Sequence, residues 1–228
     1  MTKRNINYLE HDLRTSIIND VKTVARYHSR GYKGIQAGHF SIPRQVFCYV
    51  DYLGYIAYGG DGSTERSEKF LKKYFPPIYK DYAELIYSMW RHGTIHEYSP
   101  KSYYIQGAGK KGGRLCLRWL SNNSDKKINR RVHMNVYAMT GKPDELYLVV
   151  NICQLVDDLL IALDSFIADL KNNLSYKGKC ELRLNEIAED QKIETIKRAK
   201  SRSKAEKQIR LATNRCAGEI DKLGTVIS

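Results

Sequence analysis

The sequence lacks a long hydrophobic run, a regular cysteine pattern and an even balance of charges. No stretch approaches the ~18 consecutive apolar residues of a membrane-spanning helix, and no apolar run of the kind found in signal peptides follows Thr2. The cysteines are scattered, odd in number and without a CxxC pair: Cys48, Cys116, Cys153, Cys180 and Cys216. This pattern argues against a disulfide framework and against a zinc cluster. We therefore expect a chain of the reducing cytoplasm, without a membrane span, a bound metal or another cofactor.

Acidic residues are too few to balance the basic ones. The chain has 38 Lys and Arg against 25 Asp and Glu, which gives a formal net charge of +13 and a pI near 9.4. A field of that sign attracts polyanions, and nucleic acid is the first expectation. Hydrophobic residues make up 42% of the 228, which suffices for one large domain or for one domain with an appendage.

The stretch from Ile86 to Pro100 holds an arginine and a histidine five positions apart, Arg91 and His96. Apolar residues before and around Arg91 recur at spacings of three and four, which predicts a helix with one buried face. Pro100 disfavours helix at the residue before it, so this helix should end near Ser99 or sooner. Residues five apart do not share one helical stripe. A long arginine side chain and a loosened last turn would still bring the two groups together.

Such a pair suits the cleavage of RNA. Histidine exchanges protons near neutral pH, and the fork of a permanently charged arginine matches a phosphate. The 2′-hydroxyl of RNA is the nucleophile, so the step needs a base, an acid and positive charge at the phosphate, but neither a metal nor a covalent enzyme intermediate. One chain supplies one proton carrier, and a two-fold dimer would supply two. The alternative is an ordinary helix end, where cations compensate the helix dipole.

These residues also resemble a known family. Arg91-x-x-x-x-His96 is similar to the R-x4-6-H signature of the HEPN superfamily. Extended to Tyr98, the motif resembles the variant in HEPN toxins that are paired with minimal nucleotidyltransferase antitoxins. The sequence at 41–54, 89–93 and 96–101 resembles a bacterial plasmid- and defence-associated HEPN group, and the resemblance covers about residues 40–170. It implies an all-α bundle, a dimer and often metal-independent RNA cleavage that leaves a 2′,3′-cyclic phosphate, although some HEPN proteins are inactive binders.

The resemblance assigns roles residue by residue. Arg91 and His96 are the expected catalytic pair, and the expected supporting residues are His92, Tyr98 and Asp51. Tyr98 is also where an antitoxin would add a nucleotide. An ordinary solvated aspartate is the alternative for Asp51. Basic residues in and around a glycine-rich stretch are expected to guide RNA, or alternatively to protect a strand edge from aggregation: Lys101, Lys110, Lys111 and Arg114.

The spacing of apolar residues and the positions of glycine and proline predict the secondary structure of the rest of the chain. Helices are expected at 6–30, 41–58, 63–74, 78–99 and 151–170, with a break at the glycines of 59–62. Residues 106–113 lack the GxxxxGK[ST] pattern of a phosphate loop and predict a hairpin turn. Residues 114–120 and 131–137 bound a polar loop and predict a short antiparallel pair of strands. His133 is then a strand residue, and Asp157 and Asp158 are expected on the polar side of the last helix.

The resulting fold prediction is a mainly α, HEPN-like up-and-down helical bundle. It places a domain at 1–175 with a small antiparallel β-hairpin insertion at about 101–150, and a basic helical C-terminal extension at 176–228. That extension is either a solvated tail, an RNA clamp acting through phosphate charge or a partner-binding helix. The predicted function is a homodimeric, metal-independent endoribonuclease that acts as a toxin or in antiviral defence, with an antitoxin or other defence protein as partner. The alternative is a non-catalytic HEPN domain that binds RNA or protein.

Overall fold

A computed structural model describes residues 3–25, 41–60, 62–92, 102–105, 113–120, 131–139 and 142–190. The chain forms two compact units, Met1–Asn185 and Glu186–Ser228. The first unit holds the bundle and the sheet. The predicted helical C-terminal extension, 176–228, is described as far as residue 190, and the rest of it lies outside the described residues.

The chain begins with a continuous run of helix, here called the N-terminal helical segment, that alternates between α and π winding. It comprises α1 (Lys3–Asn7), η1 (Tyr8–Leu13), α2 (Arg14–Ile17) and η2 (Ile18–Lys22). Leucine, isoleucine and valine at every fourth position are buried: Leu9, Leu13, Ile17 and Val21. This apolar stripe is the reason for the helix. The predicted helix at 6–30 is confirmed as far as residue 25, where the description stops.

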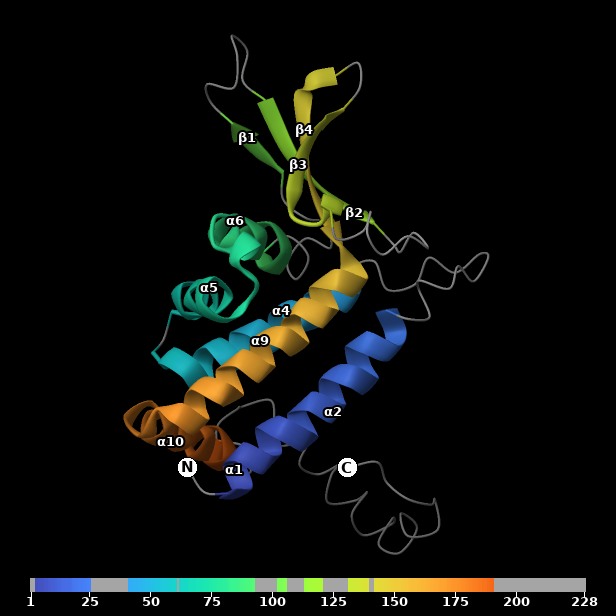
Figure 1. Cartoon of the computed structure of the whole chain (residues 1–228). Coiled ribbons are helices and arrows are strands. Elements are labelled where there is room, and N and C mark those ends of the chain that lie inside the picture. Colours follow the sequence, from blue (N-terminus) through green and yellow to red (C-terminus); the bar gives the residue numbers. More distant parts are fainter. Residues whose placement is uncertain are drawn as a thin grey trace, which may run out of the picture. The chain divides into compact units, whose positions relative to one another are not determined.

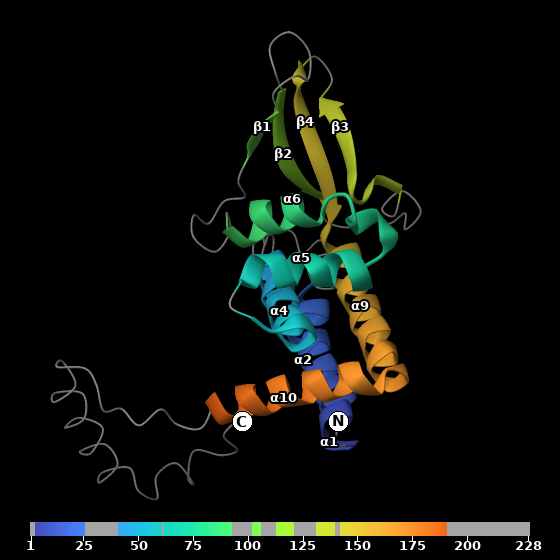
Figure 2. The same cartoon turned by 90° about the vertical axis from the view of Figure 1, so that its left-hand side faces the viewer.

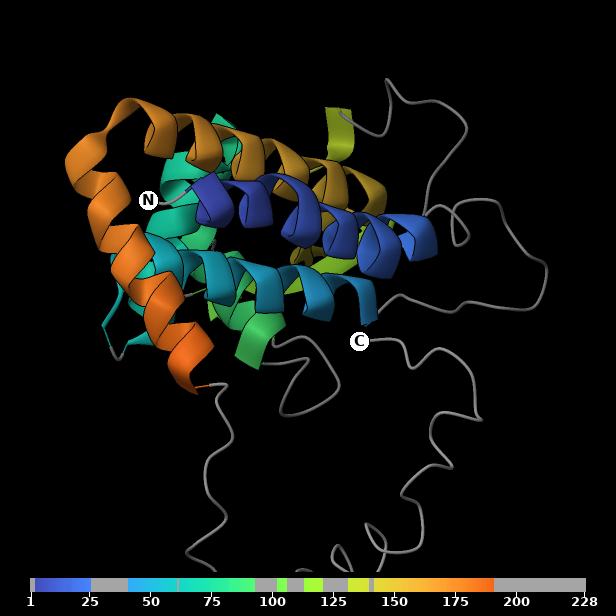
Figure 3. The same cartoon turned by 90° about the horizontal axis from the view of Figure 1, so that it is seen from below.

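Three longer helices surround the core with it. These are α4 (Ser41–Tyr58), α5 (Ser63–Tyr74) and α9 (Ile152–Asn172), all close to the predicted bounds. Figure 3 shows the N-terminal helical segment, α4 and α9 lying side by side. Ion pairs join the N-terminal helical segment to α9. Their order along one helix is the reverse of their order along the other, so the two are antiparallel: Glu10–Lys171, Arg14–Asp164 and Lys22–Asp157.

The predicted helix at 78–99 is split. Pro76 and Pro77 are followed by a 3₁₀ turn, η3 (Pro77–Tyr79), and the helix itself begins later, as α6 (Ala83–Tyr87) continued by the π-helical η4 (Ser88–His92). We call α6 and η4 together the motif helix. Residues 93–100 lie outside the described residues. Helix α10 (Leu174–Asp190) follows α9 after a short break (Figure 1).

The β insertion is a four-stranded mixed sheet in the order β1-β2-β4-β3. Its strands are β1 (Tyr103–Ile105), β2 (Gly113–Leu120), β3 (Asn135–Met139) and β4 (Lys142–Asn151). Figure 2 shows the sheet beyond one end of α9, with β4 running directly into that helix. Strands β1 and β2 are antiparallel with Ile105 opposite Gly113. The hairpin turn predicted at 106–113 falls almost wholly on residues 106–112, which lie outside the described residues.

The predicted pairing of 114–120 with 131–137 is wrong. Strand β4 lies between them, antiparallel to β3 but parallel to β2. Residues 131–134 are not strand either, because Met134 takes a left-handed conformation with φ of 59° before β3 begins. The physical reason is that β4 has the longer apolar run, Leu146 to Val150, and fills the more buried, central position of the sheet.

The described part of the chain is therefore mainly helical with a small β insertion, as the sequence predicted. Within it, no helix combines the length and apolar character needed to cross a membrane.

The C-terminal end of α4 is capped by an arginine from α10. The guanidinium of Arg183 donates to the carbonyl oxygens of Ile56 and Ala57 at 2.9 and 2.7 Å, which satisfies acceptors that a helix end leaves open. The chain then turns at Gly59 and Gly60, whose φ angles are +66° and +81°.

We expect Gly59→Ala to lower the free energy of unfolding by about 2–3 kcal/mol, and Gly60→Ala by only about 1 kcal/mol. Both changes force an L-residue into a left-handed conformation, but only a Cβ at Gly59 would meet Arg183, at 2.6 Å from Nε. Gly60 has open space around it, so it is the matched control. Urea unfolding of both variants measures the difference, and equal losses would rule out the cap as the cause.

Candidate functional site

Asp51, on α4, lies at the centre of a polar cluster that joins three other helical elements. Its Oδ2 accepts from Nε of Arg91 at 2.6 Å. Its Oδ1 accepts from the hydroxyls of Tyr87 at 2.6 Å and Ser67 at 2.8 Å. Arg91 and Tyr87 come from the motif helix and Ser67 from α5. The carboxylate of Asp51 thus accepts from three donors. The alternative of an ordinary solvated aspartate is wrong for this residue.

Apolar packing sets the register in which these groups meet. One turn before Asp51, the ring of Phe47 stacks on Trp90 with centroids 6.2 Å apart and meets the edge of Tyr87 at 6.1 Å. Both Phe47 and Trp90 are fully buried. Because Trp90 is fixed in the core, the next residue, Arg91, is turned toward the boundary of the bundle. The aromatic pair and the ion pair are therefore successive contacts along one helix–helix interface.

A glycine brings α5 close enough to complete the cluster. A Cβ on Gly54 would lie 3.1 Å from the carbonyl oxygen of Arg66 and 3.2 Å from the Cα of Ser67. The backbones of α4 and α5 approach each other there without an intervening side chain. Since Gly54 is three residues after Asp51, this approach places the Ser67 hydroxyl beside the carboxylate.

The electrostatics keep Arg91 charged and partly accessible. Burial disfavours its charge, but the hydrogen bond to Asp51 and the charge of that carboxylate outweigh burial, so the pKa of Arg91 is raised. Its side chain is 26% exposed, against 16% for Asp51. Among the described residues, Asp51 is the acceptor of the guanidinium, through Nε. The two terminal amino groups of the Arg91 guanidinium, Nη1 and Nη2, are the atoms that can bind a ligand.

The hydroxyl and thiol beside the pair stay protonated. Burial, followed by the hydrogen bond to Asp51, raises the pKa of Tyr87 to about 12, so Tyr87 is a donor at neutral pH. Partial desolvation also raises the pKa of the Cys48 thiol, although the charge of Arg91 opposes the shift. Cys48 is thus not poised as a thiolate nucleophile.

The sheet is tied to the motif helix next to this cluster. Ser88, three residues before Arg91, shares a hydrogen bond with the hydroxyl of Tyr103 on β1. Arg114 lies on the adjoining strand, opposite Tyr104. It is exposed and donates to the hydroxyl of Ser102 at 3.2 Å. One of the predicted RNA-binding residues is therefore on the strand pair that contacts the motif helix.

The structure describes some of the predicted site residues and not others. It brings Arg91 and Asp51 together and places Arg114 on β2. The remaining ones lie outside the described residues or, for His92, have an undescribed side chain: His92, His96, Tyr98, Lys101, Lys110 and Lys111. Sequence reasoning missed Tyr87 and Ser67. Tyr87 had a signal, since it is four residues before Arg91 on a helix, but the approach of Ser67 depends on tertiary packing.

A second polar cluster is buried where the sheet meets the bundle. The carboxylate of Asp158 accepts from the hydroxyl of Tyr79 at 2.9 Å and from Nε2 of Gln154 at 2.7 Å, and lies 3.1 Å from Nε2 of His133. Asp158 is 2% exposed. Its predicted place on the polar side of α9 is wrong, because these partners neutralise the cost of burial; its neighbour Asp157 does face solvent. His133 precedes β3 instead of belonging to a strand.

Among the residues that the structure describes, no group of three or more His, Cys, Asp or Glu side chains is arranged to hold a metal ion. Comparison with known proteins yields no family model that matches the sequence, no similar curated protein and no similar solved structure.

Proposed function

We propose that this protein is an endoribonuclease of the HEPN type, in which Arg91 binds the scissile phosphate and His96 exchanges the proton. A base removes the proton of the 2′-hydroxyl, whose oxygen attacks phosphorus. The bond to the 5′-oxygen breaks, and that oxygen takes a proton from an acid. The products are a 2′,3′-cyclic phosphate and a free 5′-hydroxyl. The reacting nucleophile belongs to the RNA, so the step requires no metal ion.

The observation that carries the proposal is how Arg91 is held. Its Nε is fixed by a half-buried carboxylate that is itself locked by two hydroxyls. A guanidinium oriented in advance loses less conformational freedom when its terminal groups bind phosphate. The net charge of +13 favours a polyanionic substrate. The resemblance of the sequence around Arg91 and His96 to the HEPN superfamily implies the same reaction, RNA cleavage.

The winding of the motif helix at Arg91 also supports a site there. Arg91 lies in a π-helical turn, Ser88–His92, and single π turns within helices are frequent at functional sites. His96 itself lies outside the described residues. We propose that His92 and Tyr98 orient or bind the substrate, and that a second copy of the chain supplies the other proton carrier across a two-fold axis.

A toxin or antiviral effector is the biological role that we propose for such an enzyme. RNA would be its substrate and an antitoxin or another defence protein its partner, with Tyr98 as the acceptor of a nucleotide. Lys101, Lys110, Lys111 and Arg114 would guide the RNA strand. The ion pair of Arg91 with Asp51 also favours a second candidate, a binding module in which that arginine only holds two helices together.

RNA cleavage in the presence of EDTA tests the proposal. We expect Arg91→Ala and His96→Ala each to slow cleavage about a hundredfold or more, since each removes charge stabilisation or proton transfer from the reaction. Lys80→Ala is the control, because Lys80 is an exposed cation outside the cluster, and it should cleave like the wild type. Cleavage at equal rates by all four proteins indicates a contaminating nuclease. RNA binding without cleavage by the wild type indicates the binding module.

A further inference from the structure

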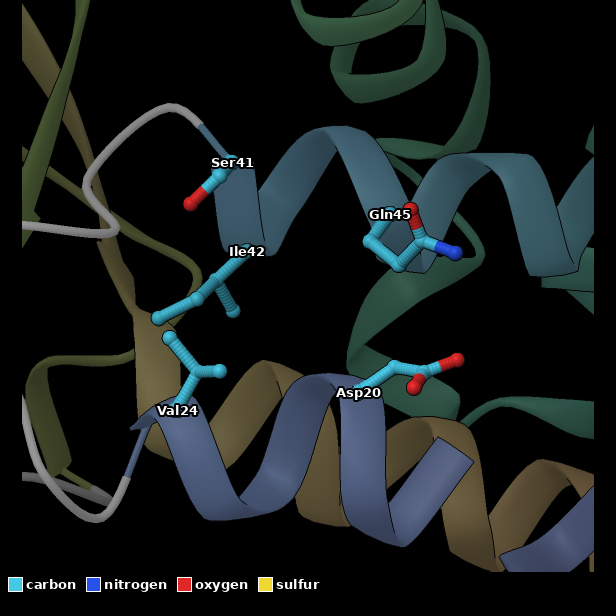
Figure 4. Close-up of a pocket in the computed structure, with 5 residues that line it drawn as sticks. All are labelled: Asp20, Val24, Ser41, Ile42 and Gln45. Carbon is cyan, nitrogen blue, oxygen red and sulfur yellow. The ribbon is translucent and has the colours of Figure 1, made fainter. Parts of the chain in front are cut away.

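A cavity of about 330 Å³ opens between α4 and the N-terminal helical segment. Figure 4 shows its lining residues: Asp20, Val24, Ser41, Ile42 and Gln45. Ligand sites begin at roughly 300 Å³, so this cavity suits a single small ring system. Asp20 and Gln45 are exposed at its mouth, whereas Ile42 is buried. A ligand can therefore enter from solvent and rest against an apolar wall.

The polar groups of the cavity offer a defined set of partners. The carboxylate of Asp20 and the carboxamide of Gln45 lie on facing helices, and Val24 and Ile42 meet at one end (Figure 4). The hydroxyl of Tyr49 donates to Oδ2 of Asp20 at 3.0 Å and so fixes the carboxylate. Each carboxylate oxygen has two acceptor positions, so Asp20 can still accept two adjacent donors from a ligand.

We propose that this cavity binds a guanine base of an RNA strand whose phosphate lies at Arg91. The N1 and N2 donors of guanine would pair with Asp20, its O6 would accept from the amide of Gln45, and its ring would rest on Val24 and Ile42. Adenine, cytosine and uracil do not present two adjacent donors. Bases of single-stranded RNA are commonly read in this way, on the Watson–Crick edge. The proposal rests on the proposed ribonuclease function.

The position of the cavity agrees with a strand that continues to Arg91. Gln45 and Asp51 are both on α4 and, at 1.5 Å per residue, about 9 Å apart along its axis. Between them lies the exposed Cys48, whose thiol is within the electrostatic reach of Arg91, Asp51 and Arg44. Two cations against one carboxylate leave this part of α4 with a net positive charge, which favours a phosphate backbone there. The net charge of +13 disfavours the other ligand that pairs with a carboxylate in this way, an arginine side chain.

Calorimetric titration of the full chain with GMP, AMP, CMP and UMP tests the cavity without any cleavage. We expect GMP to bind about tenfold more tightly than the other three. Asp20→Asn should abolish the preference without weakening the binding of AMP, because asparagine has a single acceptor oxygen, which it shares with Tyr49, and its NH2 group would face the second donor of guanine. Asp12→Asn, which changes another exposed carboxylate of the N-terminal helical segment, should keep the preference.

The outcomes separate this proposal from the ribonuclease. Equal binding of all four nucleotides, no binding, an unchanged preference in Asp20→Asn, or binding of L-argininamide as tight as that of GMP would each overturn the guanine site. Arg91→Ala should retain the GMP preference. If GMP is preferred but no RNA is cut, the catalytic proposal fails and the guanine site stands; if RNA is cut without a base preference, the reverse holds.

Discussion

Replacing Asp158 by alanine is expected to lower the free energy of unfolding by about 3–5 kcal/mol. The change removes the acceptor of Tyr79 and leaves its hydroxyl buried, since Tyr79 is fully inaccessible. His133 is affected too. Its Nδ1 accepts from the backbone N–H of Asn151 at 2.9 Å, so its proton is on Nε2, the atom that faces Asp158 and Tyr79. Two buried donors would lose their carboxylate partner at once.

The neighbouring residue provides the matched control. Asp157 is 52% exposed and pairs with Lys22 at 3.0 Å, and an exposed ion pair contributes no more than about 1 kcal/mol. Asp157→Ala should therefore be nearly neutral in guanidinium unfolding, where Asp158→Ala is not. Asp158→Asn keeps one acceptor oxygen and should fall between the two. Similar midpoints for the two alanine variants would contradict the hydrogen-bonded network at Asp158.

The adjacent residues Asp157 and Asp158 also show which features of the fold cannot be predicted from the sequence. The bounds of α4, α5 and α9 follow from apolar periodicity and from glycine and proline punctuation, which are local. Which of two adjacent aspartates faces inward is not local. Asp158 is buried because Tyr79 and His133, far away in the sequence, supply its donors. A pattern within α9 contains no information about either partner.

The sheet order failed for a similar reason. Strand β4 begins with Lys142, Pro143 and Asp144, residues that do not predict a strand. Its second half is apolar and enters the centre of the sheet, parallel to β2. Strands neighbouring in the sequence, β2 and β3, are thereby separated. Pairing between distant segments is decided by burial of both faces in the folded state, which periodicity in one segment does not show.

Asp51 was closer to being predictable. It is four residues after Phe47 and three before Gly54, and both of these face the interior of the bundle. A carboxylate on an apolar stripe needs a buried partner, and a helix that carries an arginine follows. The family resemblance pointed to the same residue. What neither could supply is the approach of Ser67, because it depends on the close contact between α4 and α5.

Asp51→Ala is expected to lower the free energy of unfolding by about 2–4 kcal/mol. The hydroxyls of Tyr87 and Ser67, both fully buried residues, lose their acceptor, and Arg91 loses its counter-charge. Cys48→Ala, one turn earlier on α4 and exposed, is the control and should change stability by less than about 0.5 kcal/mol. Thermal and urea unfolding measure both variants.

The double variant with Arg91→Ala distinguishes the two roles of the ion pair. If Asp51 mainly balances the charge of Arg91, removing both should cost less than the sum of the single changes, by about 1–3 kcal/mol. If Asp51 mainly serves the two hydroxyls, the costs should add. In the proposed ribonuclease, Asp51→Asn should also slow cleavage, since the loss of charge frees Arg91 from its fixed orientation. Full cleavage by that variant would show that orientation by Asp51 is not part of catalysis.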